Sequence, residues 1–440
     1  MKHFIEARRD AVAALQSTGI AGLAERVCLI VDLRGRCRVL IRPSGGADPE
    51  QVQGRIRALM TLAADIFWTD EVWVESAPQS PSEGALFEAA WKQARPEPRG
   101  QDKTFVIDRR FSKDAWLGAP LDPPWPQSEH TPPIVSFYSF KGGVGRTTAA
   151  IAVATNLARF GRRVVVIDLD LEAPGAGSLL QPSGGAPADL GVIDYLLERP
   201  LVGPGVIDIA EFYRFCDDRR IIGDGEPIAV VTSGALDGWY LEKLARINYE
   251  YLYRSAMETG AACSPLHDLL RSLRSAARPD VILLDSRGGL HDIGGLTVSG
   301  IAHLQVFFGL ASQQSWEGLT LTISHLGKDL LLSGKRQREC MMVHAMVPPL
   351  GRPREDEIRA FRERSFQVFS ENYYDEPDVP DAEWSIPDPE SAESPHYPLV
   401  LTRDEKIAGY SSPSDIADSL CEGEYRALAK AILERVGRTL

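Results

Sequence analysis

Hydrophobic residues in the first part of the chain alternate between helical and strand spacing. Residues 4–27, 48–67 and 83–95 have apolar positions at the spacing of an amphipathic helix. The predicted strands, which alternate apolar and polar residues, are 27–33, 36–43, 71–76 and 104–110. Asp48 followed by Pro49 marks a helix start, because aspartate caps a helix and proline suits its first turn. Residues 1–118 are therefore predicted to form a small N-terminal α/β domain.

A proline-rich stretch follows this first domain. Residues 119–133 include six prolines, and a proline has a fixed φ and no backbone N–H to donate. Such a stretch forms neither a helix interior nor a central strand. Residues 119–133 are therefore predicted to be a stiff linker, and residues 134–440 to form the second domain.

The pattern changes to an alternation of short apolar runs and helices from residue 134 onward. Residues 147–160 have helical spacing, and they stand between two apolar runs. The runs of strand type cover residues 134–139, 162–170, 279–286, 303–310 and 340–347. Continuous apolar strands separated by helices are typical of a parallel sheet that is buried on both faces. The second domain is therefore predicted to be α/β, with a mainly parallel sheet and helices on both faces.

Composition and charge narrow the possible functions. The formal net charge of -13 disfavours binding to nucleic acid or to an anionic membrane, since both need a basic surface. The six cysteines are scattered without a C-x-x-C pair, which indicates reduced thiols rather than disulfides or a metal site. No apolar run is long enough to span a bilayer, and the first residues do not read as a signal peptide. A cytoplasmic location is expected.

The loop between the strand 134–139 and the helix 147–160 has the chemistry of a phosphate site. Glycines at 142, 143 and 145 allow the backbone N–H groups to surround a phosphate, and the next helix adds its positive dipole end. Thr147 offers a hydroxyl to Mg²⁺. Two positions depart from the standard G-x-x-x-x-G-K-[ST] loop: Phe140 replaces its first glycine, and Arg146 replaces its lysine.

The stretch KGGVGRTT, residues 141–148, resembles the deviant Walker A loop of the ParA/MinD class of P-loop ATPases. It is similar to a bacterial subgroup of that class with KGGVGR in place of KGGVGK, whose members are encoded in signalling or conflict-type operons. The resemblance covers most of residues 134–440. It implies a P-loop NTPase fold, ATP and Mg²⁺ as ligands, and a homodimer with the nucleotide at its interface.

The resemblance also implies a role for individual residues. Lys141 would reach across the dimer to the partner's phosphates, and Asp170, the second aspartate of the D-x-D at 168–170, would position the attacking water. Asp285 ends the Walker B strand and would hold Mg²⁺ through water, beside the hydroxyl of Thr147. The residues expected to surround the phosphates are Gly142, Gly143, Val144, Gly145, Arg146, Thr147 and Thr148. The segment 344–351 stands where the class reads the base, without the usual Asn.

Asp168 and the residues after Asp285 also lie near this site. Asp168, the first residue of the D-x-D, is also at a position where an aspartate commonly serves as a helix cap or turn residue. The resemblance also implies that Asp285 is followed by a glycine-bearing switch segment, here Gly288 and Gly289.

Arg146 bears on the rate of catalysis. Lysine is a compact charge, whereas arginine is longer, planar and bidentate, so it can hold phosphate while sitting differently from a lysine. Loss of a well-placed transition-state contact costs about 3 kcal/mol, roughly a hundredfold in rate. The expected activity is therefore slow hydrolysis of ATP to ADP and phosphate, with Lys141, Arg146 and Asp170 as the catalytic residues.

The leading functional hypothesis is an ATP-binding switch that is gated by dimerisation and acts on a protein partner. The N-terminal domain would dock or sense that partner, and the subgroup resemblance points to bacterial signalling or defence. The first alternative is a scaffold that locks nucleotide without hydrolysis. The others are a ParA-type DNA or cargo positioner, which the acidic charge disfavours, and a bacterial tyrosine kinase, whose C-terminal tyrosine cluster the sequence lacks.

Two further segments bear on partners. Residues 228–253 begin as a strand and continue as a predicted helix rich in aromatic residues, a candidate surface for a dimer or another partner. Residues 412–436 have helical spacing but mix acidic and basic side chains, so no membrane anchor is predicted there.

Overall fold

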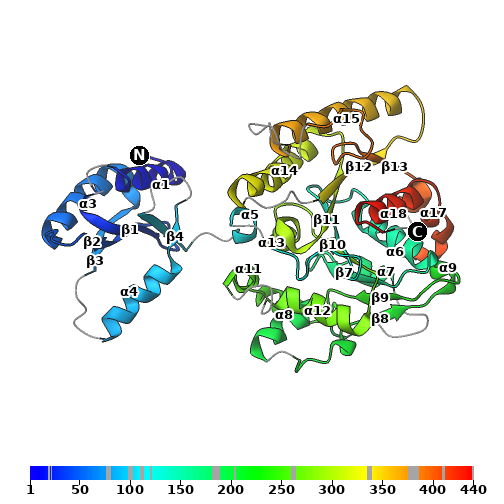
Figure 1. Ribbon diagram of the computed structural model, residues 1–440, viewed down its shortest axis with the longest axis horizontal. Helices are drawn as coiled ribbons and strands as arrows, with labels where there is room; N and C mark the ends of the chain where they lie inside the picture. The colour runs from blue at the N-terminus through cyan, green and yellow to red at the C-terminus, as the bar shows by residue number, and fades with distance from the viewer. Residues whose placement is uncertain are drawn as a thin grey trace. The chain divides into compact units, whose positions relative to one another are not determined.

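The chain forms two compact units, Met1–Ser112 and Lys113–Leu440 (Figure 1). The computed structural model describes residues 1–17, 20, 22–75, 81–97, 103–109, 113–118, 121–180, 189–202, 205–258, 264–333, 339–374, 386–408 and 412–438. Within these ranges, no helix is both long enough and apolar enough to cross a membrane.

The first unit contains a five-stranded sheet in the order β3-β2-β1-β5-β4. Its strands are β1 (Ala24–Val31), β2 (Cys37–Pro43), β3 (Trp68–Val74), β4 (Arg95–Pro96) and β5 (Thr104–Asp108). β1 pairs antiparallel with β2 and parallel with β5, which shows that the sheet is mixed. The hairpin from β1 to β2 turns at residues 32–36, where Gly35 has a φ of 81°.

Side-chain alternation along β1 divides the core of the first unit between the two faces of the sheet. Val27, Leu29 and Val31 pack with helices α1 (Phe4–Leu15) and α3 (Pro49–Ala64). Cys28 and Ile30 point to the other face and pack with α4 (Pro81–Gln93). Asp48 caps α3 by accepting a hydrogen bond from the backbone N–H of Glu50, as the Asp-Pro start predicts.

The first predicted helix is shorter than its apolar spacing suggests. α1 ends at Leu15, and the chain passes through turns at residues 16–17 and 22–23 before β1 begins at Ala24. Pairing of Ala24–Val31 with β2 and β5 satisfies the backbone groups that a longer helix would have used. Sheet pairing therefore overrides the helical spacing of residues 24–27.

The proline-rich segment 119–133 belongs to the second unit, which begins at Lys113 and includes the short helix α5 (Asp114–Leu117). Leu121 and Trp125 are buried in the core of that unit. The Trp125 Nε1–H donates to the carbonyl of Pro132 at 2.8 Å, and Trp125's own carbonyl lies 2.9 Å from Nε2 of His303. This segment therefore differs from a free spacer: its prolines preclude regular structure, but its apolar side chains still pack on the sheet.

The second unit is built on an eight-stranded sheet in the order β13-β12-β11-β6-β10-β7-β9-β8. Its strands are β6 (Ile134–Ser139), β7 (Val164–Leu169), β8 (Arg214–Cys216), β9 (Ile228–Val231), β10 (Val281–Ser286), β11 (Leu304–Gly309), β12 (Glu339–Val347) and β13 (Leu399–Thr402). All neighbours pair parallel except β8, which runs antiparallel to β9 at the edge. The expected α/β class with a mainly parallel sheet is confirmed.

Helices cover both faces of this sheet (Figure 1). One face carries α6 (Arg146–Arg159), α9 (Arg219–Ile222), α17 (Ala417–Cys421) and α18 (Gly423–Arg435). The other carries α8 (Val192–Glu198), α12 (Pro265–Ala277), α13 (Asp292–Leu296), α14 (Gln313–Ser333) and α15 (Arg352–Asn372). Alternate residues of β6 serve the two faces: Val135 and Phe137 pack with α6, and Ile134 and Tyr138 with the opposite helices.

The aromatic segment after β9 forms two helices in place of the predicted single one. α10 spans Tyr240–Ala245 and α11 spans Tyr249–Glu258. Tyr240 and Tyr253 are buried, whereas Trp239 and Tyr251 are exposed. The segment is thus divided between core and surface, and its role as a partner surface stays a prediction.

Candidate nucleotide-binding site

A glycine loop connects β6 to α6 at the carboxyl edge of the parallel sheet. Gly143 and Gly145 have φ values of 72° and 80°, a region that side chains with a Cβ rarely adopt. Gly145 is also the N-cap of α6 and offers no side chain to the first N–H groups of the helix. A glycine-rich turn that opens a helix favours a phosphate at this place, because the first N–H groups of a helix have no intrahelical partner.

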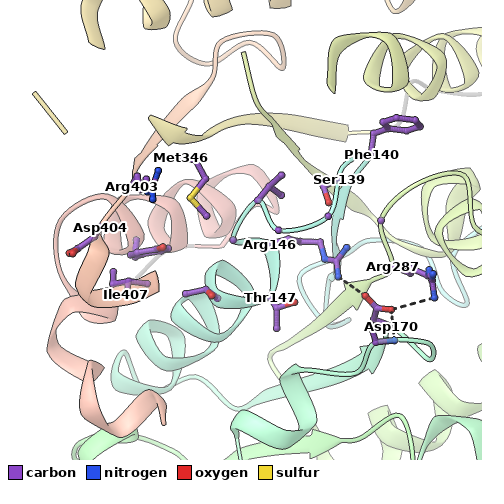
Figure 2. Close-up of a pocket in the computed structure, with 18 of the residues that line it drawn as sticks. Ser139, Phe140, Arg146, Thr147, Asp170, Arg287, Met346, Arg403, Asp404 and Ile407 are labelled. Atoms are coloured by element: carbon purple, nitrogen blue, oxygen red, sulfur yellow. Dashed lines mark hydrogen bonds and ion pairs between the residues drawn. The ribbon is translucent and has the colours of Figure 1, made fainter. Parts of the chain in front are cut away.

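A cavity of about 940 Å³ lies over this loop (Figure 2). We call one part of its wall the phosphate end, which comprises Ser139, Phe140, Gly142, Gly143, Val144, Gly145, Arg146, Thr147, Thr148, Asp170, Ala173, Arg287 and Gly288. We call the rest the open end, which comprises Met346, Thr402, Arg403, Asp404, Ile407 and Tyr425. All seven residues expected to surround the phosphates lie in this wall, together with Asp170.

Arg146 points into the protein, toward the aspartates at the ends of two neighbouring strands. Its Nε donates to Oδ1 of Asp285 at 2.8 Å and its Nη2 to Oδ2 of Asp170 at 3.0 Å. Only 8% of Arg146 is exposed. Burial alone would lower the pKa of Arg146, but the charges and hydrogen bonds of Asp285 and Asp170 outweigh burial and raise it. The guanidinium is therefore charged and tied to both carboxylates.

Asp285 is the penultimate residue of β10 (Val281–Ser286) and is fully buried. Its Oδ1 accepts from Arg146, whereas its Oδ2 has no hydrogen-bond partner among the described residues. Since a buried carboxylate oxygen seldom stays unsatisfied, Oδ2 has the capacity to hold a water or another donor. This free oxygen suits the predicted role of Asp285, that of a ligand acting through water.

Asp168 organises the loop that follows β7. Its carboxylate accepts hydrogen bonds from the backbone N–H groups of Asp170, Gly175 and Gly177. Burial, followed by the nearby charge of Asp285, raises the pKa of Asp168. Asp168 thus serves as a turn residue, one of the interpretations given above, while Asp170 faces the cavity.

Phe140 leaves room for the phosphate because its ring packs on helix α14. A Cβ added to Gly318 would lie 1.9 Å from Cγ of Phe140, so the ring covers the backbone of α14 at that glycine. Figure 2 shows the Phe140 side chain directed away from the open end of the cavity. This packing explains how the loop accommodates a phenylalanine where standard loops carry glycine.

An ion-pair cluster links the two segments that follow β7 and β10. Nη1 of Arg287 lies 2.7 Å from Oε2 of Glu172 and 4.0 Å from Oδ1 of Asp170. Nε2 of His291 lies 2.5 Å from Oε1 of Glu172, and the hydroxyl of Tyr249 donates to the same oxygen at 3.3 Å. Burial of Glu172 opposes its ionisation, but His291 and Arg287 together lower its pKa. Glu172 therefore stays charged at the centre of this cluster.

The donors present fit a magnesium ion whose remaining ligands come from phosphate and water. The Thr147 side chain reaches the cavity, and Asp285 has one free oxygen. Magnesium usually takes few protein ligands at nucleotide sites and keeps several waters. The described residues contain no group of three or more His, Cys, Asp or Glu side chains able to hold a metal alone.

Residues at the open end were missed by sequence reasoning, apart from the segment that contains Met346. Met346 is a non-glycine residue with a φ of 58°, and its Cε would lie 3.3 Å from a Cβ placed on Gly145. Arg403 and Ile407 follow β13, and Tyr425 lies on α18. These residues gather because β12 and β13 end at the same edge of the sheet as β6. The parallel pattern was the signal that could have located them.

Lys141 is partly buried and, within the described chain, does not contribute to the cavity wall. Its predicted reach toward a second subunit stays a prediction.

Residues 135–336 match the family model of the CobQ/CobB/MinD/ParA nucleotide binding domain. The loop, α6, Asp170 and Asp285 all fall within that range. This part of the chain is therefore similar to nucleotide-binding domains of the ParA/MinD type.

Individual relatives are similar over short stretches. The chromosome-partitioning ATPase Soj of Thermus thermophilus is 44% identical over 63 residues, which are 14% of this chain and 23% of Soj. An uncharacterised protein of Mycobacterium tuberculosis is 35% identical over 79 residues, which are 18% of this chain and 21% of that protein. The chain thus spans about a fifth of the length of the curated relatives it matches.

Among solved structures, Cyanothece McdA in a complex with ATP has a TM-score of 0.45 at 15% identity, and the match covers 71% of this chain and 99% of McdA.

Proposed function

We propose that the protein is an ATP-dependent switch that dimerises across the bound nucleotide and acts on a protein partner. The observation that carries this proposal is the cavity itself. A glycine loop, the start of a helix, the side chain of Thr147 and the carboxylate of Asp170 converge on it, in a domain of the ParA/MinD nucleotide-binding type.

Slow hydrolysis follows from the position of Arg146. Asp170 is proposed to orient the attacking water, yet its Oδ2 already accepts from Arg146. A carboxylate occupied by a charged donor is a poorer acceptor for water, so each turnover must loosen this pair. We therefore propose that the pairing of Arg146 with Asp170 and Asp285 keeps hydrolysis slow and prolongs the ATP-bound state.

When bound, Mg²⁺ would neutralise phosphate charge, and Thr147 and Asp285 would hold it. The protein's own contributions are separate from the metal. The loop N–H groups bind the phosphates, and Arg146 orients the two carboxylates. Asp170 accepts a hydrogen bond from the attacking water.

The proposed dimer and the proposed partner rest on different parts of the chain. Lys141 is available for a contact across the dimer because it does not line its own subunit's cavity, within the part described. The N-terminal unit has its own hydrophobic core, and none of its described residues contributes to the cavity wall, so we propose that it docks the partner. A role in bacterial signalling or defence follows from the subgroup resemblance. DNA is not proposed as a ligand, because the net charge is -13.

The test combines phosphate release with light scattering on the full chain. Wild-type protein with Mg-ATP should dimerise and release phosphate slowly, Asp170→Ala should dimerise without release, and Lys141→Ala should stay monomeric. Binding of ATP without dimerisation would contradict the switch.

One observation favours a second function, the nucleotide-locked scaffold. Arg146 binds both carboxylates at once, an arrangement that could exclude the attacking water permanently. A scaffold would purify with intact ATP and would release no phosphate even as wild type.

A further inference from the structure

Arg287 is a charged residue of the phosphate end for which the motifs assign no role. It follows β10 directly, two residues after Asp285, and its side chain forms part of the cavity wall (Figure 2). One third of this side chain is exposed, compared with 9% for that of Arg146. Two arginines thus share the phosphate end but differ in their access to a ligand.

Arg146 cannot easily turn toward a ligand. It is bound to two buried carboxylates, and moving it would leave Asp285 charged, buried and unpaired. Breaking a buried ion pair by removing one partner is strongly unfavourable. A phosphate in this cavity would therefore meet Arg287 more readily than Arg146.

The present partners of Arg287 are replaceable. Its Nη1 lies near Glu172 and, more distantly, Asp170, and both carboxylates are on the segment after β7. Nη1 of Arg287 and Oε2 of Glu172 are close together but do not form a hydrogen bond, so this ion pair is weaker than a hydrogen-bonded one. A phosphate group carries more charge and accepts two parallel N–H bonds from a guanidinium, so it competes well for the same arginine.

The backbone around Arg287 is held in place, which leaves the side chain as the moving part. The N–H of Gly289 donates to the carbonyl of Ser139 at 3.0 Å. A Cβ added to Gly288 would lie 3.0 Å from that carbonyl oxygen and 3.3 Å from Nη1 of Arg146, so only glycine fits without displacement. The segment after β10 is thus anchored to the end of β6, beside the phosphate loop.

We infer that Arg287 leaves Glu172 when ATP binds and contacts the terminal phosphate of ATP instead. This inference rests on the proposed function, because it requires ATP in this cavity. Release of the phosphate returns Arg287 to Glu172, which also contacts His291 and Tyr249. Since Tyr249 begins α11, the exchange connects the terminal phosphate to the aromatic segment at the surface.

The competing explanation is that Arg287 only cross-links the two segments through Glu172. The variants Arg287→Ala and Glu172→Gln separate the two explanations, because both remove the cross-link but only the first removes the arginine. Arg287→Lys keeps a charge without the bidentate fork. Arg163→Ala is the matched control, since Arg163 is also a partly exposed arginine paired with an aspartate, Asp280, outside the cavity.

The experiment measures dissociation constants of the full chain for Mg-ATP and Mg-ADP by titration calorimetry. Wild type and Arg163→Ala should prefer ATP. Arg287→Ala should lose about ten- to a hundredfold of this preference, while its affinity for ADP, which also reports correct folding, stays unchanged. Glu172→Gln should keep or increase the preference, and Arg287→Lys should keep part of it.

Several results would overturn the inference. A wild-type preference retained in Arg287→Ala would show that Arg287 does not contact the terminal phosphate. Equal losses in Arg287→Ala and Glu172→Gln would show that it is a cross-link. Arg287→Ala could fail to bind ADP, and the other two variants then decide. If Arg287→Lys keeps the full preference for ATP over ADP while Glu172→Gln loses it, the inference is also rejected. If wild-type protein binds ADP and ATP equally, the inference about Arg287 is overturned but the proposed function is not. If wild-type protein binds neither nucleotide, both are overturned.

Discussion

The two ends of the cavity are built on different physical principles. At the phosphate end, the charges of Arg146, Asp170 and Asp285 are buried and paired with one another. At the open end, Arg403 and Asp404 are exposed, and Met346 is more than one third exposed. Buried charges need exact partners, whereas exposed groups are screened by water. The phosphate end is therefore expected to tolerate substitution poorly and the open end well.

The largest expected effect comes from removing a buried charge at the phosphate end. Asp285→Asn takes one of two carboxylates from the buried Arg146 and should lower the free energy of unfolding by about 3–5 kcal/mol. The measurement is urea unfolding of the full chain. Asp280→Asn, which breaks the exposed pair with Arg163, should cost less than about 1 kcal/mol. Similar losses in both variants would remove the contrast between buried and exposed charge.

A smaller effect is expected from the packing that lets Phe140 stand in the loop. Gly318→Ala places a Cβ in the Phe140 ring and should destabilise the protein by about 1–3 kcal/mol. Thermal and urea unfolding would measure this, and adding Phe140→Ala should restore most of the loss. Gly54→Ala on α3, where a Cβ meets no atom within 4 Å, is the control and should be neutral or stabilising. A double variant as unstable as Gly318→Ala would argue against this contact.

Acid should reveal a buried group beside the open end. His344 is fully buried and stacks on Phe361 at 3.8 Å. Burial, and then Arg354 and Arg362, lower its pKa to about 4, although Oε1 of Glu357 lies 3.3 Å from its Nε2. Because this pKa lies below the unfolded value of about 6.5, neutral His344 stabilises the fold above pH 6.5, and that contribution is lost as the pH falls toward 4.

Between pH 7 and pH 5, this loss should be about 2 kcal/mol in the free energy of unfolding. Urea unfolding at both pH values should show a weaker pH dependence in His344→Gln than in wild type. His130→Gln, at an exposed position, serves as the control. Identical pH dependence in wild type and His344→Gln would refute this assignment.

Motifs close together in the sequence could be located without a structure. The glycine loop and the start of α6 are contiguous. Asp170 directly follows β7 and Asp285 lies near the end of the neighbouring parallel strand β10, so their convergence follows from topology. The open end could not be assembled in this way, because Met346, Arg403 and Tyr425 come from three separate segments. Their meeting depends on the order of β12 and β13 in the sheet.

Side-chain direction was the second limit of the sequence. The position of Arg146 in the loop predicts a contact with phosphate, but its long side chain turns to Asp170 and Asp285. Nothing in the sequence indicates that Phe140 packs on Gly318 or that Arg287 lines the cavity. Such choices depend on partners that only folding brings near.

The most direct test of the account is phosphate release from Mg-ATP by Arg146→Lys, compared with wild type. A lysine is a compact charge that cannot hold both carboxylates as a planar fork does, so Asp170 should become free to orient water. The account predicts release faster by about ten- to a hundredfold, and abolished again when Asp170→Ala is added. Release by Arg146→Lys at or below the wild-type rate, with ATP binding intact, would contradict it.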